Sequence, residues 1–228
     1  MNKLKRALRK ILTPYLYGTS SAELASSQAY FSQFGEDVCL QFLLKSTDGF
    51  YVDIGAFHPM NLSNTYHLYK RGWKGLIVDP NPAVAPLFYR FRSRDVICEC
   101  AVSNSASDEM DFMLYEKPAF NCLRQFEAAV PEGIRATGKS IKVEVRRLKD
   151  IFEEFGIKRI DYLNVDCEGS DLSVLESNDW SRWKPQVLTV EDHSKDWQNS
   201  EISSYMISLG YEFVGRTVIT SVFSKKMV

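Results

Sequence analysis

"FYVDIGAFHPMNLSNT", residues 50–65, joins a strand-like apolar run to a turn that carries a single glycine, Gly55. A turn that binds a dinucleotide usually reads G-x-G-x-x-G, because the glycines let the diphosphate approach the backbone. Here the residues AFHPM, 56–60, fill the positions where further glycines would stand. The stretch therefore predicts a buried strand and a turn in which Gly55 lets the backbone approach an adenosyl ligand that has no phosphate.

Outward from this strand, short apolar runs alternate with amphipathic ones, which is typical of an α/β fold. A right-handed crossover at each strand–helix–strand step gives an open, mostly parallel sheet with helices on both faces. In the first helix, Val38, Phe42 and Leu43 are predicted to form the apolar face. Strands are expected at 49–55, 74–82, 95–104, 109–116 (antiparallel), 141–148, 160–169 and 185–193, with a closing pair from 211. Helices are expected at 32–45, 64–72, 82–92, 148–156, 170–178 and 200–210.

Acidic residues follow the ends of four predicted strands. In an open α/β sheet the ligand lies outside the carboxyl ends of the strands, where these side chains would gather. A role as helix N-cap would explain any one of them, but a ligand explains the whole set better. Asp79 follows Asp53 by 26 residues, which suits an acid that accepts the hydroxyls of a ribose. The set is Asp53, Asp79, Asp166, Glu168, Glu191 and Asp192, with His193 beside it.

The composition excludes several classes of protein. The chain has 228 residues, 45% of them hydrophobic, and a formal net charge of -1, so one domain is expected and nucleic acid is not an expected partner. Its five cysteines are odd in number and lie partly in apolar runs, which indicates a reduced, cytoplasmic protein. No stretch approaches the roughly 18 apolar residues of a membrane span.

The first 28 residues are predicted to form a basic helical arm and a small, polar linker ahead of a domain at 29–228. Within residues 1–17, apolar side chains recur at helical spacing opposite basic ones. This pattern fits peripheral contact with the inner face of an anionic membrane. It also fits an ordinary surface helix packed on the domain, which is the interpretation we favour.

Residues 133–140, GIRATGKS, match the phosphate-binding pattern G-x-x-x-x-G-K-[ST]. A true P-loop leaves a buried strand and opens a helix, whereas this octet precedes the strand-like run at 141–148. We therefore interpret the match as accidental. A mobile basic loop is expected instead over about 117–140, at the mouth of the cleft. It would recognise an anionic or hydroxyl-rich acceptor, or be a solvated surface loop.

Six blocks of the sequence, taken in order, resemble the FkbM family of S-adenosylmethionine-dependent methyltransferases. They are FSQFGEDVCLQFLL, FYVDIGAFHPMNLSNTYHLYKRGWKGLIVDPNP, CAVSN, VRRLKDIF, IDYLNVDCEGSDLSVL and VLTVEDH, within roughly residues 30–215. The resemblance implies a Rossmann-like class I methyltransferase fold, a three-layer sandwich around a seven-stranded, mostly parallel sheet with an antiparallel last strand. It also implies O-methylation, often of a sugar hydroxyl, and hence a small-molecule or glycan acceptor.

Carried over position by position, the resemblance implies a site for S-adenosylmethionine at the ends of the first strands. The loop around the methionine part would consist of Asp53, Gly55 and Ala56. Phe57, next in that loop, would shape the cofactor pocket or face the acceptor. The residues that would hold the ribose and adenine are Asp79, Asn81, Ala101, Val102 and Ser103. Those that would close over the cofactor from the side are Gln33 and Asp37.

The chemistry would fall to the ends of the later strands, at Asp166, Glu168, Glu191, Asp192 and His193. A sugar hydroxyl is a weak nucleophile at neutral pH, so its proton must leave as the oxygen attacks the methyl group. His193 is a candidate base, since the reference pKa of histidine is about 6.5, although it would equally serve as a cap for the next turn.

A second route is Mg²⁺ on Asp166, Glu191 and Asp192, which would bind two sugar oxygens and lower the pKa of the hydroxyl. The alternative to an enzyme is a non-catalytic nucleoside- or glycan-binding module of a glycan-assembly complex. The sequence predicts no oligomeric state.

Overall fold

The computed structural model describes residues 29–225, and the chain from Phe31 onward forms one compact unit. The predicted arm and linker, residues 1–28, lie outside the described residues, and so does the membrane contact expected of residues 1–17. None of the helices described within 29–225 is long and apolar enough to cross a membrane.

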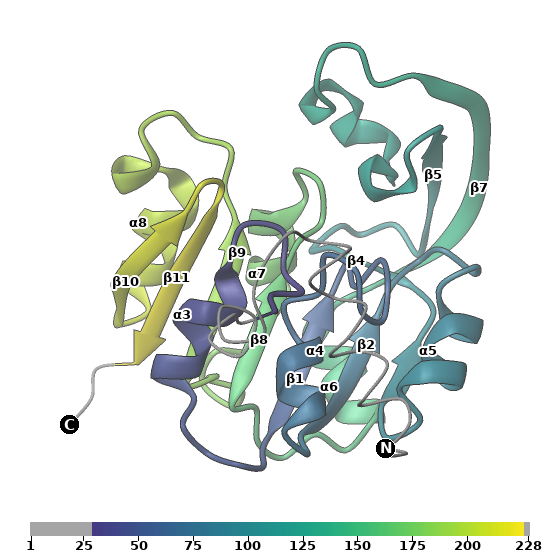
Figure 1. The fold of residues 1–228 in the computed structure, drawn as a ribbon. Helices are drawn as coiled ribbons and strands as arrows, with labels where there is room; N and C mark the ends of the chain where they lie inside the picture. The colour runs from purple at the N-terminus through teal and green to yellow at the C-terminus, as the bar shows by residue number, and fades with distance from the viewer. Residues whose placement is uncertain (1–28, 226–228) are drawn as a thin grey trace, which may run out of the picture. The chain divides into compact units, whose positions relative to one another are not determined.

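A seven-stranded sheet forms the centre of the fold, in the order β10-β11-β9-β8-β1-β2-β3 (Figure 1). Neighbouring strands from β9 to β3 run parallel, and β11 is antiparallel to both of its neighbours. This arrangement confirms the predicted sheet with its antiparallel last strand. The strands are β1 (Phe50–Ile54), β2 (Lys74–Val78), β3 (Val96–Cys98), β8 (Tyr162–Val165), β9 (Val187–Glu191), β10 (Tyr211–Thr217) and β11 (Thr220–Lys225).

Helices cover both faces of this sheet and give the three predicted layers (Figure 1). Side chains alternate between the two faces of a strand, so Val52 and Ile54 of β1 pack in one apolar core and Tyr51 packs in the other. The first core is closed by α6, α7 and α8, and the second by α3, α4 and α5. Each buried aliphatic side chain stabilises the fold by about 1.5–3 kcal/mol. The helices are α3 (Glu36–Leu43), α4 (Tyr66–Lys70), α5 (Ala85–Phe91), α6 (Leu148–Glu154), α7 (Asp171–Glu176) and α8 (Glu201–Ser208).

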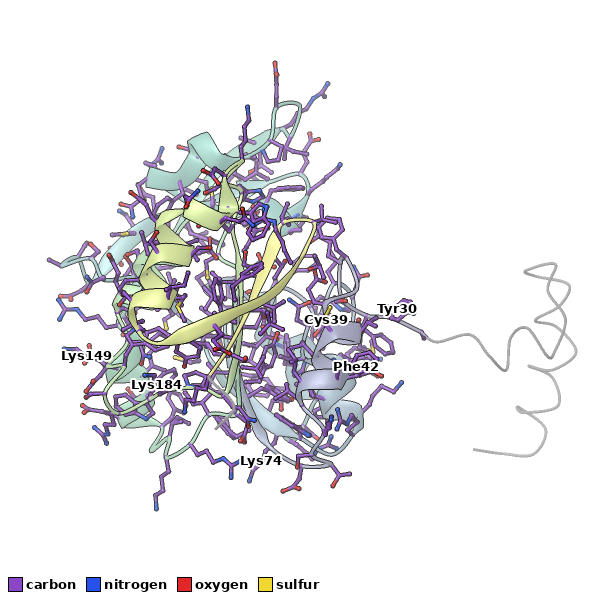
Figure 2. The ribbon with its side chains drawn as sticks, turned by 90° about the vertical axis from the view of Figure 1, so that its left-hand side faces the viewer. Tyr30, Cys39, Phe42, Lys74, Lys149 and Lys184 are labelled. Atoms are coloured by element: carbon purple, nitrogen blue, oxygen red, sulfur yellow. The ribbon has the colours of Figure 1, made fainter. Side chains whose placement is uncertain are left out.

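The first described helix, α3, turns a different face to the core from the predicted one. Leu40 and Leu44 are buried, whereas Phe42 is 73% exposed at the surface (Figure 2). The helix begins at Glu36, after Gly35 with a φ of 86°, rather than at residue 32. Residues four apart share a helix face, so Glu36, Leu40 and Leu44 line up toward the core. The predicted apolar face of this helix is therefore wrong.

A second, four-stranded sheet, in the order β4-β7-β5-β6, is formed by the chain between β3 and α6 (Figure 1). The single strand predicted at 95–104 is wrong, because the chain leaves the main sheet after β3 and its next strand, β4, pairs with β7. The strands of the second sheet are β4 (Ala101–Val102), β5 (Glu109–Tyr115), β6 (Cys122–Leu123) and β7 (Ala136–Arg146).

The loop expected over about 117–140 is also wrong, because these residues form short elements of the second sheet. They contain the 3₁₀ helices η1 (Pro118–Phe120) and η2 (Arg124–Ala129), strand β6 and the first residues of β7. The octet at 133–140 leads into β7 and not into a helix. This confirms that its match to the P-loop pattern is accidental.

Candidate functional site

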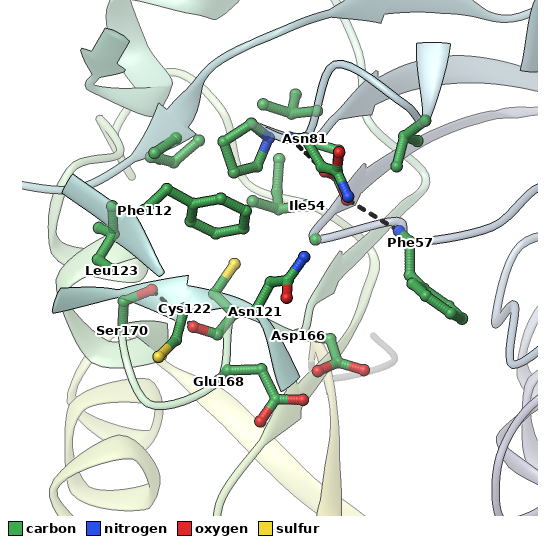
Figure 3. A pocket seen from close by; sticks show the side chains of 18 of the residues that line it. Ile54, Phe57, Asn81, Phe112, Asn121, Cys122, Leu123, Asp166, Glu168 and Ser170 are labelled. Carbon is green, nitrogen blue, oxygen red and sulfur yellow. Dashed lines mark hydrogen bonds between the residues drawn. The ribbon is translucent and has the colours of Figure 1, made fainter. Parts of the chain in front are cut away.

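A cavity with about 840 Å³ of empty space, its open mouth included, lies at the carboxyl edge of the main sheet (Figure 3). One wall comes from the ends of β1 and β2 and the turn after β8, and the other comes from β4, β5, η1 and β6. The lining includes Gln33, Gly55, Phe57, Asp79, Asn81, Ala101, Val102, Phe112, Asn121, Leu123, Asp166 and Glu168.

Gly55 forms the turn after β1, with a φ of +77°. Its amide donates to the carbonyl oxygen of Val78 at 2.9 Å, which ties the turn to the end of β2. A Cβ at this position would lie 1.7 Å from the carbonyl oxygen of Asp166, so the turn after β8 occupies the space of a side chain. Glycine is therefore required both by the left-handed backbone and by the close approach of two strand ends.

Asp79 follows β2, and the backbone fixes its buried carboxylate. Oδ2 accepts from the amide of Phe57 at 2.9 Å, and Oδ1 accepts from the amide of Asn81 at 2.8 Å (Figure 3). Burial raises the pKa of Asp79 to about 6, against the two backbone hydrogen bonds, which favour the charged form. Each oxygen keeps lone-pair capacity for another donor, so the carboxylate can accept two neighbouring hydroxyls.

The second sheet supplies most of the apolar side of the cavity. Phe112 of β5 and Leu123 of β6 lie beside Ile54, the last residue of β1 (Figure 3). Together with Ala101 and Val102 of β4, they form a slot that suits a flat apolar ring such as adenine. Phe112 and Leu123 were missed by the sequence-based assignment. The alternation at 109–116 indicates a strand, but it does not say which cavity that strand borders.

Asp53 does not line the cavity but is buried behind the Gly55 turn. It accepts a hydrogen bond from the hydroxyl of Thr65 and another, at 2.8 Å, from the side-chain amide of Asn164. Burial raises its pKa, while the charge of Arg92 opposes that shift. Asp53 therefore joins β1 to β8 and to the start of α4. Any effect it has on a ligand is indirect, through the position of the Gly55 turn.

Three other residues predicted for the cofactor are likewise absent from the cavity lining. Asp37 accepts hydrogen bonds from the loop ahead of α3, at the amide of residue 31 and the hydroxyl of residue 32. Ala56 packs in the core between the sheet and α3 to α5. Ser103 pairs with the hydroxyl of Ser173 at 2.9 Å. Those that do line the cavity are Gln33, Gly55, Phe57, Asp79, Asn81, Ala101 and Val102.

Acidic side chains gather at one side of the cavity, after β8 and β9. Asp166 and Glu168 line it, on the same side as Asn121 (Figure 3). Oε2 of Glu191 lies 3.2 Å from Nε2 of His193. A carboxylate oxygen of Glu168, one of Glu191 and a ring nitrogen of His193 all lie within 4.8 Å of one another. Four of the five residues predicted for the chemistry are thus brought to one place.

Asp192, the fifth, points away from this group. Its Oδ2 accepts from the hydroxyl of Ser200 at 2.6 Å, and its Oδ1 accepts from the amide of Ser194 at 2.9 Å. Ser200 is the N-cap of α8, so Asp192 supports the start of that helix. Successive side chains of an extended chain point to opposite sides, which separates Asp192 from Glu191. The three ligands expected for Mg²⁺, Asp166, Glu191 and Asp192, are therefore not assembled.

The acids after β8 raise one another's pKa. Burial raises the pKa of Glu168 to about 8, with a further contribution from the charge of Glu191. Burial followed by the charge of Glu191 raises the pKa of Asp166 well above its usual range and that of Asp171 to about 7. The pKa of His193 is raised, first by its interaction with the nearby carboxylate of Glu191. Strong mutual repulsion in a cleft is typical of a functional site.

The sheet order, the single-glycine turn, the acid after the second strand and the cavity between them define an open α/β fold with a nucleoside-type site at the carboxyl ends of its strands. The chain belongs to the FkbM methyltransferase family: the profile described as "Methyltransferase FkbM domain" matches residues 53–213, which is more than half of the chain. The resemblance seen in the sequence is thereby confirmed, and the protein is an S-adenosylmethionine-dependent methyltransferase.

Two solved structures match the chain at low sequence identity. The 1,6-didemethyltoxoflavin-N1-methyltransferase of Burkholderia thailandensis, with bound 1,6-didemethyltoxoflavin and S-adenosylhomocysteine, matches with a TM-score of 0.45 and 13% identity, covering 99% of this chain and 90% of that one. PH1948 of Pyrococcus horikoshii, named as a candidate RNA methyltransferase, matches with a TM-score of 0.46 and 12% identity, covering 90% and 97%. None of the curated proteins matches the chain.

Proposed function

We propose that this methyltransferase acts on oxygen, and that its acceptor is a hydroxyl of a sugar or glycan. The observation that supports this most is the group of Asp166, Glu168, Glu191 and His193 at one side of the cofactor cavity. A hydroxyl is a weak nucleophile at neutral pH, and removal of its proton requires groups of this kind. S-adenosylmethionine supplies an electrophilic methyl group on a sulfonium sulfur.

The residues of the cavity fit that cofactor. Asp79, held by two backbone amides, is placed to accept the two ribose hydroxyls. Phe112, Leu123 and Val102 offer apolar walls to the adenine ring. Since Gly55 and Asp79 end neighbouring strands, the methionine part would lie toward Gly55 and the reacting methyl group toward Asp166.

The reaction is a direct displacement at the methyl carbon. The bond from the acceptor oxygen to this carbon forms as the carbon–sulfur bond breaks, and the sulfur leaves as a neutral thioether. We assign the hydroxyl proton to the carboxylate of Asp166, since that residue lines the cavity next to Gly55. Asn121 would orient the acceptor, because its Oδ1 accepts from the amide of Tyr115 at 2.8 Å and its NH₂ group remains to bind a sugar oxygen.

The test is transfer of labelled methyl from S-adenosylmethionine to a panel of sugars, nucleotide-sugars and glycans, with amines and thiols as controls. Mass spectrometry of the product should place the label on an oxygen. Label on nitrogen or sulfur alone would contradict the proposal. Asp166→Asn should lose most of the turnover and keep cofactor affinity, which calorimetry with S-adenosylmethionine measures separately.

Family membership favours an enzyme over the non-catalytic binding module considered from the sequence. The methyl-transfer assay distinguishes the two, because a nucleoside- or glycan-binding module would bind S-adenosylmethionine or a glycan but transfer no methyl group to any acceptor. We also propose a cytoplasmic location. The five cysteines all lie in the described part of the chain and form no disulfide, which suits a reducing compartment.

A further inference from the structure

Glu168, Glu191 and His193 form a compact group of potential metal ligands. Their ligand atoms lie within 4.8 Å of one another, with Oε2 of Glu191 3.2 Å from Nε2 of His193. β8 and β9 are neighbours in the sheet, and Val165 faces Val190 in their parallel register. Glu191 is thus the last residue of β9, and Glu168 and His193 follow the ends of these two adjacent strands.

Glu191 has an unsatisfied carboxylate. Its side chain is only 6% exposed, and among residues 29–225 no donor forms a hydrogen bond to the buried oxygen Oε2. A buried charged oxygen without a hydrogen bond costs several kcal/mol unless something else compensates for it. The half-exposed ring of His193 is within ion-pair distance, but it does not supply a hydrogen bond of good geometry.

The surroundings of this group are acidic. Asp166 and Asp171 lie near enough to Glu168 and Glu191 to interact with them electrostatically. In the described part of the chain, no lysine or arginine forms an ion pair with any of these four acids. The carboxylate of Asp171 already accepts hydrogen bonds from the backbone amides of residues 167 and 169. On this side of the cavity the mutual repulsion of these acids is therefore not offset by a lysine or arginine of the described chain.

We propose that Glu168, Glu191 and His193 bind a divalent cation at this edge of the sheet. Two carboxylates and one imidazole leave coordination positions open, and a nitrogen ligand favours a transition metal such as Mn²⁺ over Mg²⁺. This ligand set shares only Glu191 with the one expected from the sequence. The role of the cation rests on the proposed function: it would bind neighbouring oxygens of the acceptor and hold a hydroxyl beside the cofactor.

The proposed cation site lies between the cofactor cavity and an adjoining surface depression. Glu168 lines the cofactor cavity, whereas Glu191 and His193 line the adjoining depression toward α8. An acceptor that enters along this depression would reach the methyl group past the metal. This explains why Asp192, although next to Glu191, has no part in the site: it is bonded to Ser200 on α8.

Binding of Mn²⁺ to the chelator-treated full chain tests the proposal without an acceptor. The electron paramagnetic resonance signal of free Mn²⁺ should fall as one ion binds per chain. Glu191→Gln and His193→Ala should each weaken binding at least about tenfold. The matched control is Glu201→Gln, which removes an exposed carboxylate from the same depression and should leave Mn²⁺ affinity unchanged.

The fold of each variant is checked by its affinity for S-adenosylmethionine, which should stay that of the unmodified chain. Absence of Mn²⁺ binding at millimolar concentration would overturn the proposal, and so would equal losses in Glu191→Gln and Glu201→Gln. A protein that binds Mn²⁺ through these residues but transfers no methyl to oxygen would instead contradict the proposed function. The two failures are therefore distinguishable.

Discussion

Gly55 is the residue that lets the turn after β1 and the turn after β8 lie against each other. Its missing side chain makes room for the carbonyl oxygen of Asp166, and its positive φ forms the turn that borders the cavity. The first requirement is a steric one imposed by a neighbouring strand end, and the second is a backbone requirement. Substitution can separate the steric requirement from the backbone requirement, because another glycine, Gly156, has a positive φ but no close neighbour.

Gly55→Ala should destabilise the protein by more than about 2 kcal/mol, since an L side chain at positive φ costs about 1–2 kcal/mol and the Cβ would also meet Asp166. Urea unfolding measures the change. The matched control is Gly156→Ala, because Gly156 has a φ of +61° and nothing within 4 Å of an added Cβ. Equal losses in the two variants would show that the contact with Asp166 has no energetic weight.

Asp79 should make cofactor binding depend on pH. Its pKa is raised to about 6, and the charged carboxylate is the form that accepts both ribose hydroxyls. Protonation below that pH removes the stronger acceptor, so affinity should fall by up to about tenfold per pH unit on acidification. Calorimetric titrations with S-adenosylmethionine at pH values from 5 to 8, about one pH unit apart, would detect this loss of affinity.

Asp79→Asn provides the control for this pH dependence. It keeps one oxygen for the backbone amide of Phe57 or Asn81 but carries no charge. Affinity should be lower than in the unmodified chain near neutral pH and should vary much less with pH. An unaltered pH profile in this variant would assign the titration to another group.

At the same scale, the sequence shows which residue types gather at the strand ends but not which way they face. Asp79 and Gly55 could be predicted because each follows a recognisable buried strand. Asp192 could have been separated from Glu191 by strand alternation alone, since neighbours point to opposite sides. Glu191 and His193, two residues apart, were the pair that this rule would have kept together.

At the scale of elements, the second sheet is the feature that decides the shape of the cavity. The strands β5 and β7 could be predicted from their alternation, but their pairing could not, because alternation is the same in either sheet. The break between β3 and β4 also escaped prediction, since the residues from Val96 to Val102 include no glycine or proline that would mark the end of a strand. The cavity residues of η1 and β6 were missed because the sequence does not show that these elements pack beside the cavity.

Filling the cavity from η1 should exclude the cofactor without unfolding the protein. Ala119 lines the cavity and is half-buried, so Ala119→Trp should lower the affinity for S-adenosylmethionine at least about tenfold. The neighbouring Lys117 is exposed and does not line it, so Lys117→Trp should bind normally. Calorimetry compares the affinities, and thermal unfolding should show similar midpoints for both variants.

At the scale of the whole molecule, two large cores flank the main sheet, while the second sheet has small cores of its own. Because fewer apolar side chains hold the second sheet together, it should open locally at a lower free energy than the main sheet. A ligand between the two sheets contacts both and should stabilise the weaker one more visibly.

Hydrogen exchange followed by mass spectrometry would measure this difference. Peptides from 109–123 should exchange faster than peptides from β1 and β8 in the free protein. S-adenosylmethionine should slow exchange in 109–123 by several-fold and change β1 and β8 little, since those strands are already protected. Equal protection of both sheets without cofactor would show that they unfold as one cooperative unit.

Two very short segments connect the second sheet to the rest of the fold. Only Glu99 and Cys100 join β3 to β4, and only Arg147 joins β7 to α6, so both links lie together where β4 pairs with β7. We expect these two short connectors to act as a hinge, about which the wall formed by β5 and β6 can turn while each sheet keeps its own hydrogen bonds. Exchange of the spent cofactor for a fresh one would then be a swing of this wall, and the frequency of that swing would set an upper limit on turnover.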